Sequence, residues 1–514
     1  MAPFAIIRTM VVEREQEEQL TLFTPFPRIR FIPETVAREE LLRPCGRFHS
    51  VVPKETRLIG AIRERLLARE RDDSFVSVPG MPLSWRAMLE YLHEHELIAE
   101  PGFHLPLFDN SHPKTFSLRL RPYPDKDSTD ARNATYNAFA SGRDIERVME
   151  RVVGEVLERR FLRQYHASDL VAASADEMRG RGLDLDTLNG FAPFQLEAVP
   201  LGARDDHAPL LWERGYEVQT GRRTYLPAQL VYWSYAQGKD GERILGDSTT
   251  SGCAGHFTRE EALLSALLEL IERDGFLIYW LNMLSPRVIE VARSPDPSIR
   301  RLLAYLERYR IRPYFLDTTT DIGIPSLVCV VVDELSGSRI GIGGACGFDL
   351  ARMVTRASEE ALSVYRARMQ PEQLPEDYRP FLDTTVTLGR RRALWQNEQM
   401  LAQMGFFLRG GPIAPDDFMR PSLRAPAGAQ AQLSYVSESL ASLGTGYEPY
   451  AYEVRDPVLN ELGYHVVRCI VPQLVPLYLR EHLATLDAPR LSEVPGKLGF
   501  EPAKTLNRTP HPFL

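Results

Sequence analysis

Two copies of one short pattern, E-x-x-E-R, contain the side chains best suited to chemistry in this sequence. The first copy consists of Glu155, Glu158 and Arg159, and the second of Glu269, Glu272 and Arg273. Residues three apart lie on one face of a helix, so the two carboxylates of each copy point the same way. Like charges in an apolar run are costly without a cation between them, so the paired carboxylates on the two helices are predicted to hold Mg²⁺ together, and Mg²⁺ with arginines suits a polyphosphate. The alternative is a pair of solvated helix faces with weak local ion pairs.

A long helix is expected around the second copy, from Thr258 to Trp280. Leucine and isoleucine recur there at helical spacing, and Thr258 followed by two glutamates is a helix start signal. Glu261 precedes Glu269 by close to two full turns, so the two acids share a side of the helix. Glu261 is therefore predicted to belong to the same nucleotide site.

Four stretches of the sequence, in order, resemble the motifs of the YcaO family, enzymes that use ATP to activate backbone amides in peptides. They read ASGRDIERVMERVVGEVLERR, TSGCAGHFTREEALLSALLELIERD, TRASEEALSVYRAR and, at the end of the chain, NRTPHPFL. The resemblance covers roughly residues 130–514, and its second stretch is long and specific.

The resemblance implies an ATP-dependent cyclodehydratase that converts Cys, Ser or Thr of a ribosomal precursor peptide into thiazoline or (methyl)oxazoline. ATP and Mg²⁺ are the implied cofactors, and the metal ligands are Glu155, Glu158, Glu269 and Glu272. Such a set of acids suits two or more Mg²⁺ ions that bridge ATP phosphates. The sequence has no Walker loop and no protein-kinase signature, so the nucleotide is expected to be held in a different way.

Three arginines complete the expected nucleotide site. Arg143 lies at a loop-to-helix junction, where a cation and free backbone N–H groups can meet phosphate. Arg273 belongs to the second E-x-x-E-R copy, and the resemblance places Arg356 near the nucleotide phosphates. Many relatives carry E-x-x-Q on the helix of Arg356, whereas this chain has Glu360 followed by a serine three residues later.

The last residues resemble the proline-rich tail of the azoline-forming members, which is implied to reach back to the active site. Pro510 and Pro512 restrict the backbone, so the terminal carboxylate of Leu514 would be presented in one place as a base or orienting group. Relatives usually end in proline, where this chain has Leu514. The alternative is a frayed terminus without a catalytic role.

The composition is that of a soluble globular protein, with 44% hydrophobic and 25% charged residues. A formal net charge of −8 argues against a nucleic-acid binder, and no apolar run approaches the length needed to span a bilayer. The N-terminus lacks a secretory signal, so the cytoplasm is the expected compartment. Five scattered cysteines without a C-x-x-C pair give no support for a zinc site.

The predicted fold class is α+β, with a large YcaO-type mixed α/β catalytic domain over residues 126–514 and a small N-terminal domain over residues 1–125. Within the small domain, a helix capped by Ser84 is expected to end at Pro101-Gly102. This segment resembles the winged-helix modules that clasp precursor leader peptides in azoline-forming relatives. A packing domain without a ligand is the alternative.

Several strands are expected between and after the two E-x-x-E-R copies. Patterns of β-branched and aromatic residues predict strands within residues 224–235, 324–335 and 464–479. Residues 338–348 contain glycines that do not match a nucleotide-binding G-x-G-x-x-G motif, and they are interpreted as a β-turn with close packing.

The resemblance also implies partners: the precursor peptide, a separate leader-binding E1-like protein and an FMN-dependent azoline dehydrogenase. A homodimer is expected, and neither nucleic acid nor membrane is a predicted partner. Two other functions stay open, a YcaO enzyme that makes a thioamide or amidine and a non-catalytic scaffold on this fold. Product mass separates the first of these from ring formation, and the absence of ATP turnover would indicate the second.

Overall fold

The computed structural model describes most of the chain after residue 82. The described residues are 83–104, 114–121, 137–142, 144–163, 165–198, 207–233, 235, 237, 242–334, 339–366 and 371–514. The chain divides into two units, one formed by residues 1–160 with 457–463 and the other by residues 161–456 with 464–514. The predicted domain boundary at residue 125 lies outside the described residues and stays a prediction, as does the winged-helix interpretation.

The described part of the first unit is a three-stranded antiparallel sheet with helices. The sheet has the order β1-β2-β3, and the elements are α4 (Leu83–Glu94), β1 (Ile98–His104), β2 (Lys114–Leu120), β3 (Asn137–Gly142), α5 (Ile145–Phe161) and α16 (Pro457–Leu462). Helix α4 ends earlier than predicted, and Pro101-Gly102 lies inside β1 instead of terminating the helix. The chain turns at Glu96, whose φ of 56° is left-handed and cannot continue a helix.

The second unit contains two sheets. The five-stranded sheet has the order β11-β10-β9-β8-β12, with β8 (Arg287–Ile289), β9 (Ile311–Asp317), β10 (Ser326–Asp333), β11 (Ile340–Cys346) and β12 (Pro412–Ile413). The other sheet has the order β4-β5-β13-β14-β7 with β6 paired to β5, and consists of β4 (Val171–Ser174), β5 (Pro209–Glu217), β6 (Arg223–Pro227), β7 (Cys253–His256), β13 (Tyr450–Glu453) and β14 (His465–Ile470). All pairings are antiparallel except that of β12 with β8.

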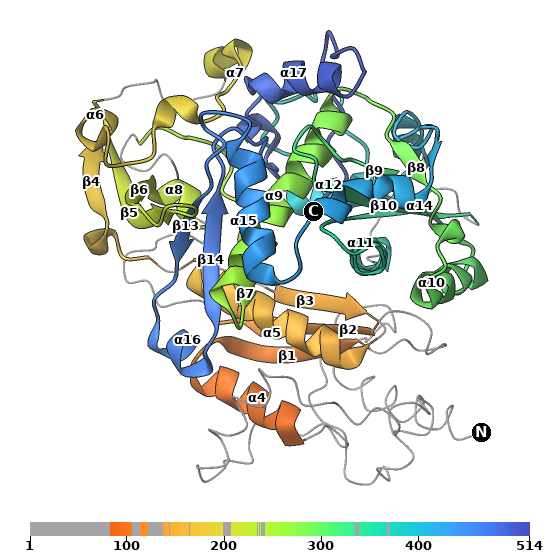
Figure 1. Cartoon of the computed structure of the whole chain (residues 1–514), viewed down its shortest axis with the longest axis horizontal. Coiled ribbons are helices and arrows are strands. Elements are labelled where there is room, and N and C mark those ends of the chain that lie inside the picture. Colours follow the sequence, from red (N-terminus) through yellow and green to blue (C-terminus); the bar gives the residue numbers. More distant parts are fainter. Residues whose placement is uncertain are drawn as a thin grey trace. The chain divides into compact units, whose positions relative to one another are not determined.

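Helix α9 (Arg259–Leu281) connects these two sheets, because it contacts β7 and β14 on one side and β10 and β11 on the other (Figure 1). Helix α11 (Leu350–Arg366) packs on β11 and β10. The remaining helices are α6 (Ala175–Met178), α7 (Pro193–Ala198), α8 (Ala228–Val231), α10 (Pro297–Arg308), α12 (Leu388–Leu394), α13 (Glu398–Gln403), α14 (Pro415–Phe418), α15 (Ala429–Ala441) and α17 (Pro489–Lys497).

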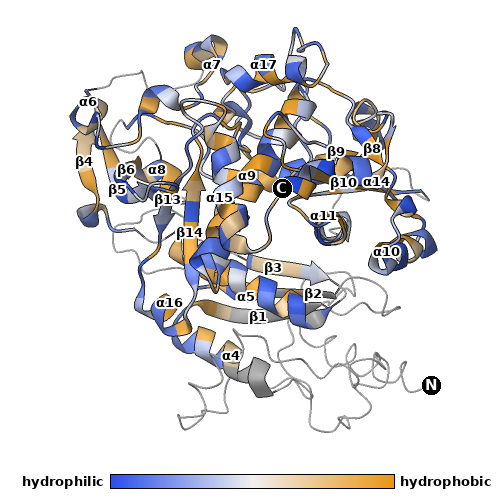
Figure 2. Ribbon diagram, viewed as in Figure 1, coloured by the Kyte–Doolittle hydropathy of each residue, from blue (hydrophilic) through white to orange (hydrophobic). Residues whose placement is uncertain are grey.

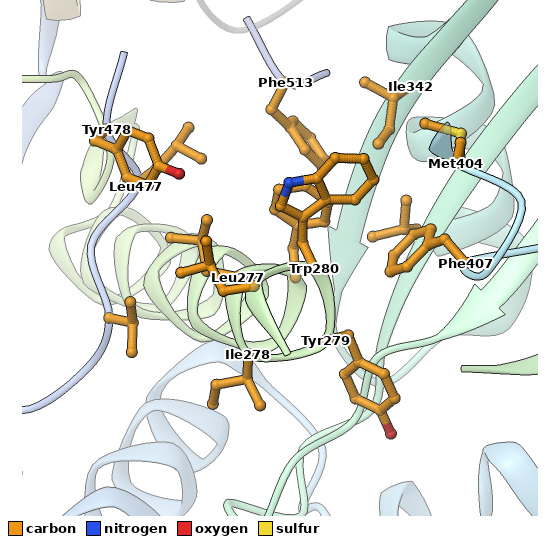
Figure 3. Close-up of a cluster of buried hydrophobic side chains, with 14 of the residues drawn as sticks. Leu277, Ile278, Tyr279, Trp280, Ile342, Met404, Phe407, Leu477, Tyr478 and Phe513 are labelled. Carbon is orange, nitrogen blue, oxygen red and sulfur yellow. The ribbon is translucent and has the colours of Figure 1, made fainter. Parts of the chain in front are cut away.

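The core of the second unit follows from the hydrophobic character of α9. Seventeen of its residues are buried, and Figure 2 shows hydrophobic residues along both α9 and β14. Its C-terminal half enters a large cluster with Phe276 and Trp280, to which the C-terminal tail contributes Phe513 (Figure 3). Burial of such aromatic side chains dominates core energetics, and it fixes the position of the polar residues one turn earlier on the same helix.

Two strand interpretations need correction, and two hold. Residues 338–348 do not form a β-turn, because Ile340–Cys346 is the fully buried strand β11. Of residues 224–235, only the first part is a strand, and Ala228–Val231 is the short helix α8. The strands expected within residues 324–335 and 464–479 are present as β10 and β14.

Candidate active site

The start of α9 matches the sequence signals. The Thr258 hydroxyl accepts a hydrogen bond from the backbone N–H of Glu261 at 3.3 Å and caps the helix. The Thr258 hydroxyl also donates to the Glu261 carboxylate at 2.8 Å, and His256 Nδ1 lies 3.1 Å from that carboxylate. Glu261 is therefore engaged in capping and in a contact with His256 at the N-terminus of the helix, whereas Glu269 is paired with Arg273.

A compact acidic cluster surrounds Arg273. We define this Arg273 cluster as Arg273 with Glu269, Glu272 and Glu360. Arg273 Nη1 lies 2.9 Å from Glu272 Oε1, while Nη2 lies 3.5 Å from Glu269 and 3.6 Å from Glu360. The second E-x-x-E-R copy thus gathers around its own arginine and recruits a third acid from α11.

Glu272 is the most deeply buried acid of the cluster, with only 1% of its surface exposed. Burial raises its pKa to about 7, against the lowering effect of the Arg273 charge. The neighbouring carboxylate of Glu360 raises the pKa further, and that of Glu269 has the same direction. A cation at this position would therefore be bound favourably, because it would offset both the burial and the repulsion.

Several polar atoms of the cluster are buried without a hydrogen bond. They are Glu272 Oε1 and the Nε and Nη1 atoms of Arg273. The 2.9 Å contact between Glu272 and Arg273 is close enough for an ion pair, but it lacks the angles of a hydrogen bond. Buried groups left in this state are costly, so they indicate a place where a ligand completes the bonding.

Strand β11 makes room for these acids through its glycines. A Cβ atom at Gly344 would overlap the Glu272 carboxylate, and one at Gly343 would overlap the Ala357 carbonyl of α11. The backbone N–H of Gly344 also donates to Glu360 at 2.9 Å. The close packing predicted for this segment is present, and its purpose is to seat two carboxylates beside the strand.

Helix α11 adds a cation as well as an acid. Its start is capped by Asp349, which accepts from the N–H of Arg352 at 2.8 Å. Arg356 is exposed and has no ion pair with any residue in the described part of the chain, yet its charge lowers the pKa of Glu272. Arg356 therefore faces the cluster as a cation that is available to a phosphate.

Glu360 is the cluster member that sequence reasoning did not assign to the site. The sequence signal was its place one turn after Arg356 in the third family-like stretch. The register of α11 against β11 brings the Glu360 carboxylate to Arg273 and to the N–H of Gly344.

The first E-x-x-E-R copy lies on α5 in the other unit. Arg159 Nη2 binds Glu155 at 2.7 Å, and Arg159 Nη1 donates to the Asn137 carbonyl. The other Glu155 oxygen accepts from the Phe139 N–H at 2.9 Å. Burial raises the pKa of Glu155, and these two partners oppose that shift. Glu158 is half-buried on the same helix, and Arg143 lies outside the described residues.

The C-terminal tail is anchored and not frayed. Pro510 and Pro512 are buried, and Leu514 is half-buried. The Asn507 N–H donates to the Leu281 carbonyl at 2.7 Å, so the tail runs against the end of α9. Phe513 places its ring 4.6 Å from the Arg273 guanidinium, which joins the tail to the cluster.

The residues of the Arg273 cluster fit a divalent cation bound together with phosphate. Among the described residues, no three His, Cys, Asp or Glu side chains lie close enough to hold a metal by themselves. Mg²⁺ characteristically takes one or two carboxylates and completes its shell with water and substrate phosphates. The unbonded Glu272 oxygen and the nearby Glu269 suit that role.

The sequence and structure were compared with known proteins. Residues 141–475 match the model of the YcaO cyclodehydratase family, whose description includes ATP and Mg²⁺ binding. These are the two cofactors predicted from the sequence, and that prediction is confirmed.

Two curated relatives are both uncharacterized proteins. One, from the tfuA 3′ region of Rhizobium leguminosarum bv. trifolii, is 28% identical over 249 residues, which are 46% of this chain and 56% of the relative. The other, from Methanothermobacter thermautotrophicus, is 25% identical over 276 residues, which are 53% of this chain and 67% of the relative.

Solved structures share the fold. A heterocyclase in complex with substrate and cofactor aligns with a TM-score of 0.64 and 20% identity, over 81% of this chain and 55% of that one. The heterocyclase TruD aligns with a TM-score of 0.55 and 22% identity, over 71% and 51%. YcaO from Methanopyrus kandleri, bound with AMPPCP and Mg²⁺, aligns at 0.51 and 19%, over 75% and 90%. This chain therefore spans about half the length of the two heterocyclases, and the predicted α+β fold class is confirmed.

Proposed function

The chain belongs to the YcaO family, and on that basis we propose that it is the ATP-dependent cyclodehydratase subunit of a peptide-modifying system. Its substrate would be a ribosomal precursor peptide whose Cys, Ser or Thr residues become thiazoline or (methyl)oxazoline rings. The observation that carries the proposal is the Arg273 cluster, in which a buried Glu272 oxygen and two Arg273 nitrogens lack hydrogen bonds. A phosphate–Mg²⁺ group is a ligand that satisfies both at once.

The proposed reaction removes the elements of water from the peptide at the expense of ATP. A Cys, Ser or Thr side chain attacks the carbonyl carbon of the preceding residue and forms a hemiorthoamide. The former carbonyl oxygen takes the γ-phosphoryl group of ATP and leaves as phosphate, while the nitrogen loses its proton and forms the C=N bond of the ring. Oxide is a poor leaving group and phosphate a good one, so the phosphoryl transfer lowers the barrier of the last step.

In this proposal the Mg²⁺ ligands would be Glu269 and Glu272 on α9, together with Glu155 and Glu158 on α5. Mg²⁺ would neutralise the charge that develops on the phosphoryl group during its transfer. Arg356 and Arg273 would bind phosphate oxygens, with Arg143 and Glu261 as further nucleotide contacts. The carboxylates act as ligands and orienting groups, and they do not transfer protons.

The tail would act at the same site. Pro510 and Pro512 are buried and hold the end of the chain beside α9, which would present the Leu514 carboxylate to the reacting amide as a base or orienting group. Leu514 stands where relatives usually have proline. A Leu514→Pro variant with unchanged turnover would show that turnover does not depend on whether residue 514 is leucine or proline.

The proposed partners are the precursor peptide, a leader-binding E1-like protein, an FMN-dependent azoline dehydrogenase and a second copy of the chain. The N-terminal domain would contact the leader region. Co-purification with the E1-like protein encoded nearby, and light scattering of the chain alone, test these proposals separately. No helix in the described part of the chain is long and apolar enough to cross a membrane.

The decisive assay incubates the chain with ATP, Mg²⁺, the partner protein and the peptide encoded beside it, and reads the product by mass spectrometry. Ring formation predicts the loss of one water mass per modified residue and one ADP per ring. Replacement of oxygen by sulfur would indicate a thioamide-forming enzyme instead. Absence of ATP turnover with all components present would favour the scaffold and contradict the proposal.

A further inference from the structure

The contact between the tail and the Arg273 cluster lies at one aromatic ring. Phe513 is 1% exposed, and the Arg273 guanidinium carbon lies 4.6 Å from its ring centroid. Figure 3 shows Phe513 and Trp280 of α9 within the same cluster of buried hydrophobic side chains, and the Phe513 ring packs on Phe276. A cation–π contact is strongest where water is excluded, as it is here.

This ring contacts the guanidinium group of Arg273, while the N–H groups of that guanidinium are only loosely held. Arg273 Nη2 is 3.5 Å from Glu269 and 3.6 Å from Glu360, beyond good hydrogen-bond distance. Its Nε and Nη1 atoms have no hydrogen bond. The N–H edge of Arg273 can therefore change partners without losing the contact between the guanidinium and the Phe513 ring.

Two hydrogen bonds of His511, which lies two residues before Phe513, hold this part of the tail in place. Arg391 of α12 is fully buried, and its Nη1 donates to the His511 carbonyl at 3.0 Å while Nη2 binds Glu481 at 2.6 Å. His511 Nε2 donates to the Tyr478 carbonyl at 2.6 Å. Burial and nearby positive charge lower the pKa of His511 well below its usual value, so its ring is neutral and this nitrogen carries the proton.

We propose that Phe513 is a positioning residue that holds Arg273 for the nucleotide. With Mg²⁺ on the carboxylates, the N–H edge of Arg273 is released from them and bonds to a phosphate oxygen, while the ring keeps the guanidinium in place. The inference rests on the proposed function. It adds a second role for the tail, which acts on nucleotide binding through Arg273 as well as on the peptide through its terminal carboxylate.

The test compares two phenylalanines that contact the same core residue. Phe513→Leu removes the ring from Arg273 and keeps an apolar side chain. Phe407 is fully buried and, like Phe513, packs on Phe276, but of these two phenylalanines only Phe513 makes a cation–π contact with Arg273 in the described part of the chain. Phe407→Leu therefore reports the loss of core packing alone.

For each variant, calorimetry gives the affinity for Mg²⁺ with AMPPCP, and thermal unfolding gives the midpoint. Phe513→Leu should weaken Mg²⁺–AMPPCP binding about tenfold, as expected for a desolvated cation–π contact. Both substitutions should lower the unfolding midpoint by a similar amount, but Phe407→Leu should leave the affinity for Mg²⁺–AMPPCP unchanged. With ATP as substrate, the Phe513 variant should show a raised KM and a smaller change in kcat.

Equal affinities for wild type and Phe513→Leu would overturn the inference, and so would an equal loss in Phe407→Leu. A wild-type chain that binds no Mg²⁺–AMPPCP would instead overturn the proposed function, and the inference with it. The wild-type measurement thus separates the two failures.

Discussion

The two E-x-x-E-R copies share one sequence pattern, but their acidic residues differ in burial and in hydrogen bonding. On α5, both oxygens of Glu155 have partners, one in Arg159 and the other in the N–H of Phe139. On α9, Glu272 is almost fully buried and one of its oxygens has no hydrogen bond, and Arg273 is shared among three acids. One copy is satisfied by its own unit, whereas the other is not.

This difference indicates that the α5 copy is already held by the protein, whereas the α9 copy needs a ligand to complete its bonding. The α5 copy is held in position by protein contacts, so a ligand would add to an arrangement that already exists. The α9 copy carries buried charge and unused donors, which are costly unless something binds. We therefore expect α9 to contribute most of the free energy of Mg²⁺–nucleotide binding. We expect α5 to contribute mainly carboxylates that the protein already holds in fixed positions.

The largest effect is expected from Glu272→Gln. The loss of a carboxylate ligand should reduce ATP turnover by about 100-fold or more, since even outer-shell changes at metal sites cost 10- to 100-fold. The variant should stay folded, because it removes a buried charge. Circular dichroism and ADP release measure the two properties, and Glu290→Gln on the surface of the same unit is the control. Wild-type turnover in Glu272→Gln would refute the role of this acid, and Glu269→Gln should behave in the same way.

Gly344→Ala should come next, with roughly a 10- to 100-fold loss of Mg²⁺–nucleotide affinity. The new methyl group would displace the Glu272 carboxylate, which is the movable end of a side chain. Gly343→Ala would instead strike the backbone of α11, so it should lower stability far more. If Gly344→Ala unfolds the protein as completely as Gly343→Ala, the seat for Glu272 has no separate function.

Arg356→Ala should weaken nucleotide binding about tenfold, the typical worth of one charge-assisted hydrogen bond. The loss should depend on the phosphates, so adenosine affinity should not change. Because Arg356 has no ion pair in the described part of the chain, the unfolding midpoint should stay near that of the wild type. A lower midpoint with unchanged affinity would assign Arg356 a structural role.

The smallest effect is expected from Arg159→Ala on α5. Its ion pair with Glu155 is a partly exposed i,i+4 pair, so its loss should cost about 0.5 kcal/mol of stability. Nucleotide affinity should fall no more than a few-fold, roughly in line with that energy. A loss as large as that of Glu272→Gln would mean that the two copies are equivalent, contrary to the comparison above.

The long helix and the pairing of acids with Arg273 were predictable, because helical spacing and capping are local properties. Glu360 was not, since its place in the cluster depends on the register of α11 against β11. From the sequence alone the glycines of β11 predict a turn, because their role depends on tertiary packing: they make room for Glu272 and for the backbone of α11.

Asp274 follows the second copy directly, and a carboxylate at this place is a possible metal ligand. It is fully buried and held by Arg490 of α17, at 2.8 Å and 2.7 Å to its two oxygens, so its role is structural.

One measurement tests the central claim most directly: a crystal structure of the chain with Mg²⁺ and AMPPCP. We expect a metal ion about 2.1 Å from carboxylate oxygens of Glu269 and Glu272 on α9, with Arg273 and Arg356 on the phosphates. A nucleotide bound elsewhere, or a metal shell formed without Glu272, would contradict it.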